Sequence, residues 1–325
     1  MIAAFLAVAL IAGTPQASEV AIGEEGRRLH GTMLAPPAPA DGAEPVLILA
    51  GSGPTDRDGN NPLGIAAAPY RLLAQGLAER GIPSLRVDKR GVGASAAAMP
   101  SERGLRIETY GEDARAWAAE LTTRTGARCV WLLGHSEGAL HALLAAERND
   151  GICGLILVAA PGRPLGDILA EQLRANPANA PILDQALAIL AEISAGRAVA
   201  AEAVPPALMP LFRPSVQPFF MSMLALDPAE LVRRRQGPML VIQGITDIQT
   251  SIVDAERLGA AREGVEVRLI DGMNHVLKAA PADRAANIAT YANPDLPLAP
   301  GLIEAVADFV LVEAAQGPSG YFSRI

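Results

Sequence analysis

Residues 130–139 read VWLLGHSEGA, and this stretch decides the fold. Its four apolar residues predict a buried strand, and the residues after Gly138 have the spacing of a helix. Between them, Gly134 to Gly138 fits the pattern Gly-x-Ser-x-Gly, in which a serine occupies a sharp turn between a strand and a helix. Such a turn has no room for side chains at its two glycines, so Ser136 is presented as a candidate nucleophile.

Short apolar runs and helical stretches alternate on both sides of this segment. The apolar runs predict strands at residues 46–50, 84–87, 129–133, 152–159, 239–243 and 265–270. The helical spacing predicts helices at residues 69–80, 107–123, 138–148, 254–261 and 301–313. Continuous apolar strands that alternate with helices are typical of an α/β fold, with a mainly parallel sheet covered by helices on both faces.

The alternation of strands and helices stops between residues 161 and 237. This region is rich in proline, has helix-like spacing and contains no convincing strand. We therefore expect one α/β core made of residues 19–160 and 238–325, which opens with a hairpin at residues 19–34. Residues 161–237 are expected to form a helical insertion between two strands of the same sheet.

The first 18 residues are expected to be a signal segment. Residues 2–12 are apolar and small residues follow them, as in a secretory signal, although no Lys or Arg precedes Arg27. The apolar stretch is too short to span a bilayer comfortably, and no later segment predicts a membrane span. We expect export to the periplasm or the medium, and a cytoplasmic location if the segment is not a signal.

Composition and charge exclude some classes of partner. Half of the 325 residues are hydrophobic, which is ample for a large core without metal or disulfide support. The net charge of −8 disfavours binding to nucleic acid, because phosphate backbones are also negative. The two cysteines, Cys129 and Cys153, begin neighbouring predicted strands. Two buried thiols are expected, and a disulfide is the alternative if the protein is exported.

The candidate base is one of four histidines. His30 lies in the predicted hairpin, His135 adjoins the serine on a turn that directs neighbours differently, and His141 lies on the following helix. His275 follows the last predicted strand, where a loop can bring an imidazole over the turn that carries Ser136. The order of serine, acid and histidine along the chain also favours His275.

The candidate acid lies on the loop after the preceding strand. Asp247 follows the strand at residues 239–243, and its carboxylate would hold the His275 tautomer. Asp227 falls before that strand, and Asp254 is better placed as a carboxylate at the start of a helix. Asp271 is too close to His275 along the loop to reach its ring easily. The predicted triad is therefore Ser136, Asp247 and His275.

Backbone N–H groups are expected to stabilise the negative oxygen that forms when such a serine attacks a carbonyl. One donor should be Glu137, directly after the serine. The other should come from the loop after the first buried strand, where Ser52 is the prediction and Gly53 the alternative. No metal-binding pattern such as H-E-x-x-H is present, and the chemistry needs no cofactor.

These motifs together resemble the α/β-hydrolase superfamily, near its serine-aminopeptidase-like branch, which holds many bacterial esterases. The resemblance extends across residues 29–302 and rests on residues 50–59, 86–95, 134–138, 244–247 and 272–275. It implies that the insertion at residues 161–237 is the superfamily's cap, which shapes substrate access. Phe219, Phe220, Met221 and Met223 in this cap are expected either to line an acyl pocket or to form its own core.

The resemblance implies hydrolysis of small carboxylic esters with short acyl chains through an acyl-enzyme. An aminopeptidase or a thioesterase would use the same triad, and the aminopeptidase would need a cap carboxylate to hold the substrate amine. Glu171, Glu202 and Glu230 are the candidates for that role. A binding protein without catalytic activity is the alternative from a different class, because a fold does not dictate function. The sequence gives no signal for an oligomeric state.

Overall fold

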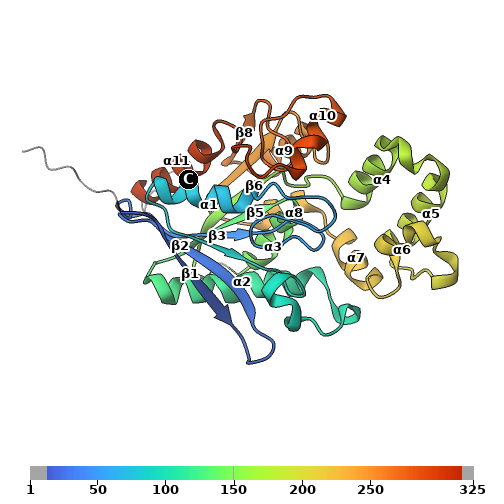
Figure 1. Ribbon diagram of the computed structural model, residues 1–325, viewed down its shortest axis with the longest axis horizontal. Coiled ribbons are helices and arrows are strands. Elements are labelled where there is room, and N and C mark those ends of the chain that lie inside the picture. The colour runs from blue at the N-terminus through green and yellow to red at the C-terminus, as the bar shows by residue number, and fades with distance from the viewer. Residues whose placement is uncertain (1–12, 149, 317–325) are drawn as a thin grey trace, which may run out of the picture.

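The computed structural model describes residues 13–148 and 150–316, and within them eight strands form one sheet (Figure 1). The strand order is β1-β2-β4-β3-β5-β6-β7-β8. The strands are β1 Gln16–Ile22, β2 Leu29–Ala35, β3 Val46–Leu49, β4 Ser84–Val87, β5 Val130–His135, β6 Ile152–Val158, β7 Met239–Gly244 and β8 Val265–Ile270. Strand β2 runs antiparallel to both its neighbours, and every other pair is parallel. The mainly parallel sheet predicted from the sequence is confirmed.

Helices cover both faces of the sheet. Successive strand residues point to opposite sides, so a continuous apolar run places apolar side chains on both faces. In β3, Val46 and Ile48 pack with α1 Pro69–Glu79 and α11 Leu302–Gln316. Leu47 and Leu49 pack on the other face with α2 Ile107–Thr125 and α3 Gly138–Ala145, and α9 Ile252–Ala260 covers β7 and β8. Each fully buried side chain of this size stabilises the fold by roughly 1.5–3 kcal/mol. Burial on both faces explains why the strands are continuous apolar runs.

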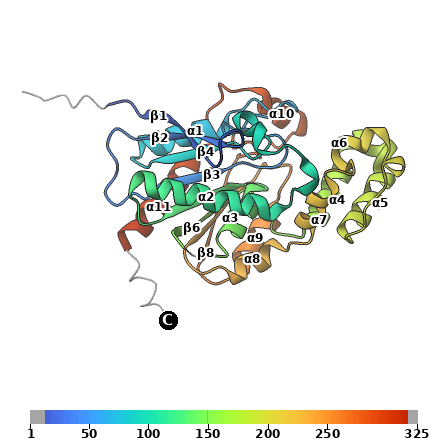
Figure 2. The ribbon, with the colours of Figure 1, turned by 90° about the horizontal axis from the view of Figure 1, so that it is seen from below.

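The helical segment between β6 and β7 projects from one end of the sheet (Figures 1 and 2). Its α-helices are α4 Leu165–Ala175, α5 Leu183–Ser194, α6 Met209–Phe212, α7 Gln217–Leu224 and α8 Pro228–Arg234. No strand occurs among residues 161–237, all of which the structure describes. Helices α4 to α7 form the projecting part, and α8 returns to pack against α3 and α9. We call residues 161–237 the cap.

Several boundaries differ from those predicted. Strand β1 begins at Gln16, which pairs with Ala35, so residues 16–18 of the expected signal segment belong to the sheet. Residues 1–12 of that segment lie outside the described residues. Helix α10, Arg284–Ala289, was not predicted, because its six residues are too few to show a period. The 3₁₀ helices are η1 Gly93–Ala98, η2 Glu102–Gly104, η3 Pro177–Ile182, η4 Ala201–Ala203, η5 Pro206–Leu208 and η6 Thr290–Ala292.

Cys129 and Cys153 form a disulfide, which corrects the expectation of two buried thiols. Their Cα atoms lie 5.1 Å apart, within the range that a disulfide can bridge. The register explains this proximity, because each cysteine lies at the start of β5 or β6 and Val130 pairs with Ile152. The bridge lies at the amino ends of these two strands, whereas Ser136 follows the carboxyl end of β5.

No described helix has both the length and the apolar character that a membrane crossing requires.

Candidate active site

Ser136 lies in a strained turn between β5 and α3. Its φ angle is +54°, in the left-handed region that side chains with a Cβ rarely adopt. The flanking glycines explain how the turn is accommodated. A Cβ at Gly134 would lie 2.3 Å from the Gly138 carbonyl oxygen, and one at Gly138 would lie 2.3 Å from that of Leu49. The Gly-x-Ser-x-Gly pattern is thus required by contacts with the neighbouring turn and strand.

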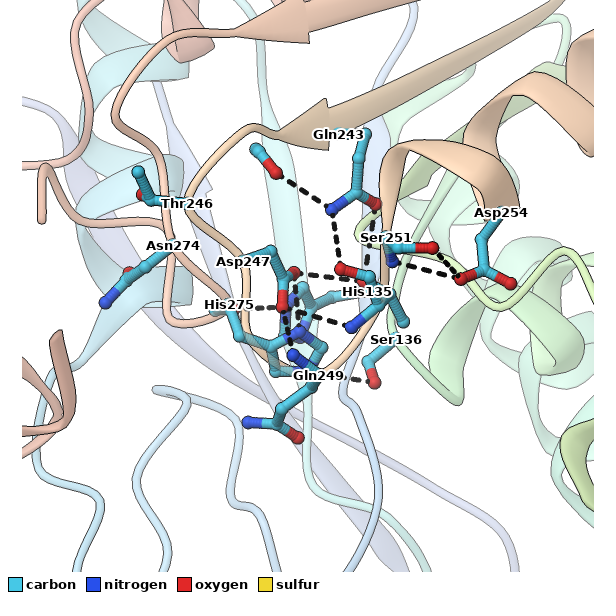
Figure 3. Close-up of polar contacts among 12 residues, drawn as sticks. His135, Ser136, Gln243, Thr246, Asp247, Gln249, Ser251, Asp254, Asn274 and His275 are labelled. Atoms are coloured by element: carbon cyan, nitrogen blue, oxygen red, sulfur yellow. Dashed lines mark hydrogen bonds and ion pairs between the residues drawn. The ribbon is translucent and has the colours of Figure 1, made fainter. Parts of the chain in front are cut away.

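The structure brings Ser136, His275 and Asp247 together in one hydrogen-bonded chain (Figure 3). His275 Nε2 lies 3.1 Å from Ser136 Oγ, and His275 Nδ1 lies 2.8 Å from Asp247 Oδ2. The three residues follow β5, β7 and β8, which are parallel strands of one half of the sheet, with β6 between β5 and β7. Their loops meet because the carboxyl ends of parallel strands share one edge. This arrangement lets the imidazole accept the serine proton while the carboxylate holds the opposite ring nitrogen.

Asp247 is buried and remains a carboxylate. Oδ1 accepts hydrogen bonds from the backbone N–H of Gln249 at 2.7 Å and of Thr250 at 3.1 Å. Oδ2 accepts the Thr250 hydroxyl at 3.0 Å in addition to the His275 ring. Burial alone would raise the pKa of Asp247, but His275 and these donors lower it below its ordinary value.

The competing aspartates have structural partners. Asp254 is the third residue of α9 and forms a capping box with Ser251, as its position at a helix start suggested. Asp227 is the N-cap of α8 and pairs with Arg257 at 2.7 Å. Within residues 13–148 and 150–316, neither aspartate forms a hydrogen bond or an ion pair with His275.

The turn that carries His275 is held from beneath by a buried amide. Asn274 donates to the Thr290 hydroxyl at 2.8 Å and to Asn287 Oδ1 at 3.2 Å. The backbone N–H of Leu277 donates to the Asn274 carbonyl at 3.0 Å, and Leu277 has a φ of +63°. Asn287 lies on α10, so the unpredicted helix serves to support the histidine loop. Figure 3 shows Asn274 directed away from the serine.

His135 links three segments of the site, although its ring does not contact the serine hydroxyl. Its Nδ1 lies 2.8 Å from the Tyr70 hydroxyl, and its Nε2 lies 2.8 Å from the His275 carbonyl oxygen. The Tyr70 hydroxyl also accepts the Gly51 N–H at 3.0 Å. A carbonyl only accepts, so Nε2 carries the proton and Nδ1 accepts from Tyr70. Burial lowers the pKa of His135 to about 3, which keeps the ring neutral.

Sequence reasoning set His135 aside and did not identify Tyr70. Neither role has a sequence signature, because Tyr70 lies on α1, 65 positions before His135 in the chain. Of the remaining histidines, His141 is buried on α3, and its Nε2 lies 3.4 Å from Glu137 Oε1. His30 lies in β2, within the predicted hairpin.

A cavity of about 690 Å³ opens beside Ser136, between the core and the cap. Ser52, Gly53 and Glu137 line it together with the serine, so both predicted oxyanion segments face the same space. The cap supplies most of the apolar lining. These residues are Pro161, Leu165, Ile168, Leu169, Pro210, Leu211, Val216, Phe219, Phe220 and Met223.

The cavity resolves two expectations about the cap. Phe219, Phe220 and Met223 line it, and Phe219 and Met223 are also buried in the hydrophobic core, so they belong to both the pocket and the cap interior. Met221 packs against that core and is not among the lining residues. Glu171, Glu202 and Glu230 are not among the lining residues either.

The carboxylates that do line the cavity are already paired. Glu102 forms a salt bridge with Arg213 of the cap, and Glu137 lies 3.4 Å from Lys89 Nζ. Among residues 13–148 and 150–316, no cluster of three or more His, Cys, Asp or Glu side chains is arranged to hold a metal ion.

Comparison with known proteins connects this site to a family. Residues 65–279 match the family described as "Serine aminopeptidase, S33". Esterase EstD of Thermotoga maritima is similar, with 30% identity over 240 residues, or 71% of this chain and 54% of the relative. The chain therefore spans about half the length of that curated relative.

Solved structures share the fold at low sequence identity. Est1E from Butyrivibrio proteoclasticus has a TM-score of 0.56 and 16% identity, covering 91% of this chain and 99% of that one. A proline iminopeptidase from Mycobacterium smegmatis also has a TM-score of 0.56 and 16% identity, covering 92% and 99%. Est1E and a proline iminopeptidase thus share this architecture to the same degree, so these likenesses indicate the fold and not the substrate.

Proposed function

Because the chain belongs to the serine aminopeptidase S33 family of α/β hydrolases, we propose that it is a serine esterase that cleaves small carboxylic esters. The observation that carries the proposal is the hydrogen-bonded chain from Asp247 through His275 to Ser136 beside a mainly apolar cavity. Similarity to Esterase EstD supports the choice of ester bonds.

In the proposed reaction, His275 Nε2 removes the proton from Ser136 as the serine oxygen attacks the ester carbonyl. Asp247 stabilises the imidazolium that forms, and the backbone N–H groups of Ser52 and Glu137 bind the oxyanion. Collapse of this intermediate expels the alcohol, which takes its proton from His275. Water then attacks the acyl-enzyme by the same route and releases the acid.

The cavity favours an ester over a peptide with a free amine. An exopeptidase needs an unpaired carboxylate near the nucleophile to hold the substrate ammonium group. Glu102 and Glu137, the carboxylates that line the cavity, are engaged by Arg213 and Lys89. An apolar acyl group, in contrast, loses unfavourable contact with water when it packs against Phe219, Phe220 and Met223.

We propose that the acyl chain is short. The cavity volume of about 690 Å³ falls within the roughly 300–1,000 Å³ that small-molecule sites occupy. This space must hold the alcohol portion as well as the acyl chain, which limits the length of either.

The test is hydrolysis of p-nitrophenyl esters from acetate to palmitate by wild type, Ser136→Ala and Ser194→Ala. Ser194 is an exposed serine at the end of α5 and serves as the matched control. We expect wild type and Ser194→Ala to hydrolyse short esters fastest, and Ser136→Ala to lose at least about a thousandfold in kcat.

Other outcomes would redirect the proposal. Activity on thioesters or aminoacyl amides that exceeds activity on every ester would replace the esterase by a thioesterase or an aminopeptidase. Absence of turnover and of fluorophosphonate labelling at Ser136 would favour a binding protein without catalytic activity.

The disulfide supports a proposal of export. Disulfides persist in oxidising compartments such as the periplasm and the extracellular medium. Cell fractionation of the native host should place the protein outside the cytoplasm, and recovery in the cytoplasmic fraction with free thiols would contradict export.

A further inference from the structure

Lysine is rare in this chain, and both lysines are buried. The sequence holds two lysines, Lys89 and Lys278, among 27 basic residues. Lys89 is 7% exposed and Lys278 is fully buried, whereas long cationic side chains ordinarily keep their charge in water. Each ammonium group donates to a backbone carbonyl, Lys89 to Gly51 and Lys278 to Leu296. Lys89 alone of the two lines the cavity beside Ser136.

Lys89 contacts both segments that face the serine. Its Nζ donates to the Gly51 carbonyl oxygen and lies 3.4 Å from Glu137 Oε1. The ammonium group also lies 5.6 Å from the centre of the Tyr110 ring, within the range of a cation–π contact. Lys89 itself follows β4, two residues after the strand ends, so a third strand anchors the contact.

The contact with Gly51 determines the direction of the next N–H group. A trans peptide unit is planar, so the Gly51 carbonyl and the Ser52 N–H point in opposite directions. The N–H on the other side of Gly51 is held by the Tyr70 hydroxyl at 3.0 Å. With both of its neighbouring peptide units fixed, Gly51 cannot rotate, and the Ser52 N–H is directed away from Lys89.

The contact of Lys89 with the Glu137 carboxylate constrains the second donor, which is the backbone N–H of Glu137. Glu137 is buried, and its carboxylate lies between Lys89 and His141 Nε2, 3.4 Å from each. Its backbone N–H belongs to the peptide unit that directly follows Ser136. Burial alone would raise the pKa of Glu137, but Lys89 and His141 lower it to about 2, so a carboxylate faces the ammonium group.

We propose that Lys89 is a positioning residue of the oxyanion hole, which fixes the Ser52 and Glu137 N–H groups through the Gly51 carbonyl and the Glu137 carboxylate. The proposal rests on the esterase function proposed above. Lys89 does not touch the substrate in this role. It preorganises two donors so that they need not reorient as charge develops on the carbonyl oxygen.

The role predicts an effect on the transition state rather than on substrate binding. Lys89→Met keeps the length of the side chain and removes the ammonium group. We expect kcat on p-nitrophenyl acetate to fall about a hundredfold and KM to change less than about threefold. Affinity for an alkyl trifluoromethyl ketone, which forms an oxyanion with Ser136, should fall by the same factor as kcat/KM. Lys278→Met is the matched control, and its kcat should stay within about threefold of wild type.

A second variant and the possible outcomes make the test decisive. Lys89→Gln retains a neutral donor for the Gly51 carbonyl and should recover part of the lost kcat, which keeps the test informative if Lys89→Met does not fold. A loss confined to KM, or unchanged affinity for the ketone, would overturn the positioning role. If wild type and Lys89→Met are both active and equally so, this proposal alone is overturned. If wild type is inactive on every ester, the esterase function is overturned as well.

Discussion

At the scale of single residues, the triad depends on neighbours that do not take part in the chemistry. The chain from the Gly51 N–H through Tyr70 and His135 to the His275 carbonyl ties the oxyanion loop, the serine turn and the histidine loop together. Tyr70 and His135 are buried and uncharged, so these hydrogen bonds are sheltered from competing water.

Replacing Tyr70 by Phe should therefore loosen three loops at once. The change leaves the Gly51 N–H and His135 Nδ1 without partners, which should cost about 1–3 kcal/mol of the free energy of unfolding. We also expect a fall of about tenfold in kcat, because both the oxyanion loop and the base lose a constraint. Urea unfolding and ester hydrolysis measure the two effects.

Tyr291→Phe provides the control for this prediction. The Tyr291 hydroxyl accepts one longer hydrogen bond, 3.3 Å from Gln249 Nε2, outside the network of His135. Equal losses in the two variants would show that the Tyr70 network has no special effect on the site.

Glu137 makes stability depend on acid pH. Its pKa is about 2 in the folded chain against an ordinary value of 4.5. A lowered carboxyl pKa stabilises the fold above pH 4.5, and this contribution is lost as pH falls from 4.5 toward 2. The difference between these two pKa values corresponds to about 3 kcal/mol in the free energy of unfolding. Glu137→Gln should lose this amount at neutral pH and progressively less below pH 4.5, as measured by urea unfolding across the acid range.

An exposed carboxylate offers the comparison. Glu120 pairs with Arg124 on the surface of α2, where an ion pair contributes little. Glu120→Gln should unfold like wild type at each pH. A constant difference between Glu137→Gln and wild type from neutral pH to pH 2 would refute the assigned titration.

At the scale of elements, Arg163 joins the first cap helix to the core. Arg163 lies at the start of the cap and donates through Nε and Nη2 to Asp254 of α9, at 3.0 Å each. Its Nη1 donates to Glu171 of α4 at 2.6 Å. Because Asp254 also caps α9, the first cap helix is attached to a fixed point of the core.

Removal of this arginine should free the first cap helix. Arg163→Ala should cost roughly 2 kcal/mol in the free energy of unfolding, because it removes charged hydrogen bonds from a buried carboxylate. Hydrogen exchange should accelerate in residues 165–175, and KM should rise because Leu165, Ile168 and Leu169 line the cavity.

Arg197→Ala is the matched control, since Arg197 pairs with exposed Glu192 within the cap. Exchange in α4 that accelerates equally in both variants would contradict the role of Arg163.

At the scale of the whole molecule, the candidate site and the disulfide lie at opposite ends of the sheet. The loops after β5, β7 and β8 assemble the triad, and the disulfide joins the opposite ends of β5 and β6. This separation predicts that stability and activity respond independently to the bridge.

Replacing Cys129 and Cys153 together by Ser should lower the free energy of unfolding by about 3 kcal/mol, because the bridge closes a loop across a sequence separation of 24. The kcat of the folded protein should not change. Urea unfolding with and without reductant gives the first quantity, and ester hydrolysis the second. A lower kcat at urea concentrations too low to unfold the protein would indicate that the bridge also shapes the site.

The sequence alone determined the order of the strands along the chain and the sharp turn at Ser136, and it predicted Asp247 and His275, which the structure brings to Ser136. These features are local, because apolar runs, glycine spacing and position after a strand are written in neighbouring residues. Sequence reasoning missed helix α10 and the contacts of Tyr70, His135 and Lys89, and it placed the Cys129–Cys153 disulfide second to two buried thiols. Helix α10 is too short to show a period, and the disulfide depends on the pairing of β5 with β6. The contacts of the three side chains join positions that lie far apart in the chain, and only the packing of loops at one edge of the sheet brings them together. Cavity shape and the pairing of Glu102 with Arg213 were likewise decided by the cap's position over the core, which no periodicity encodes.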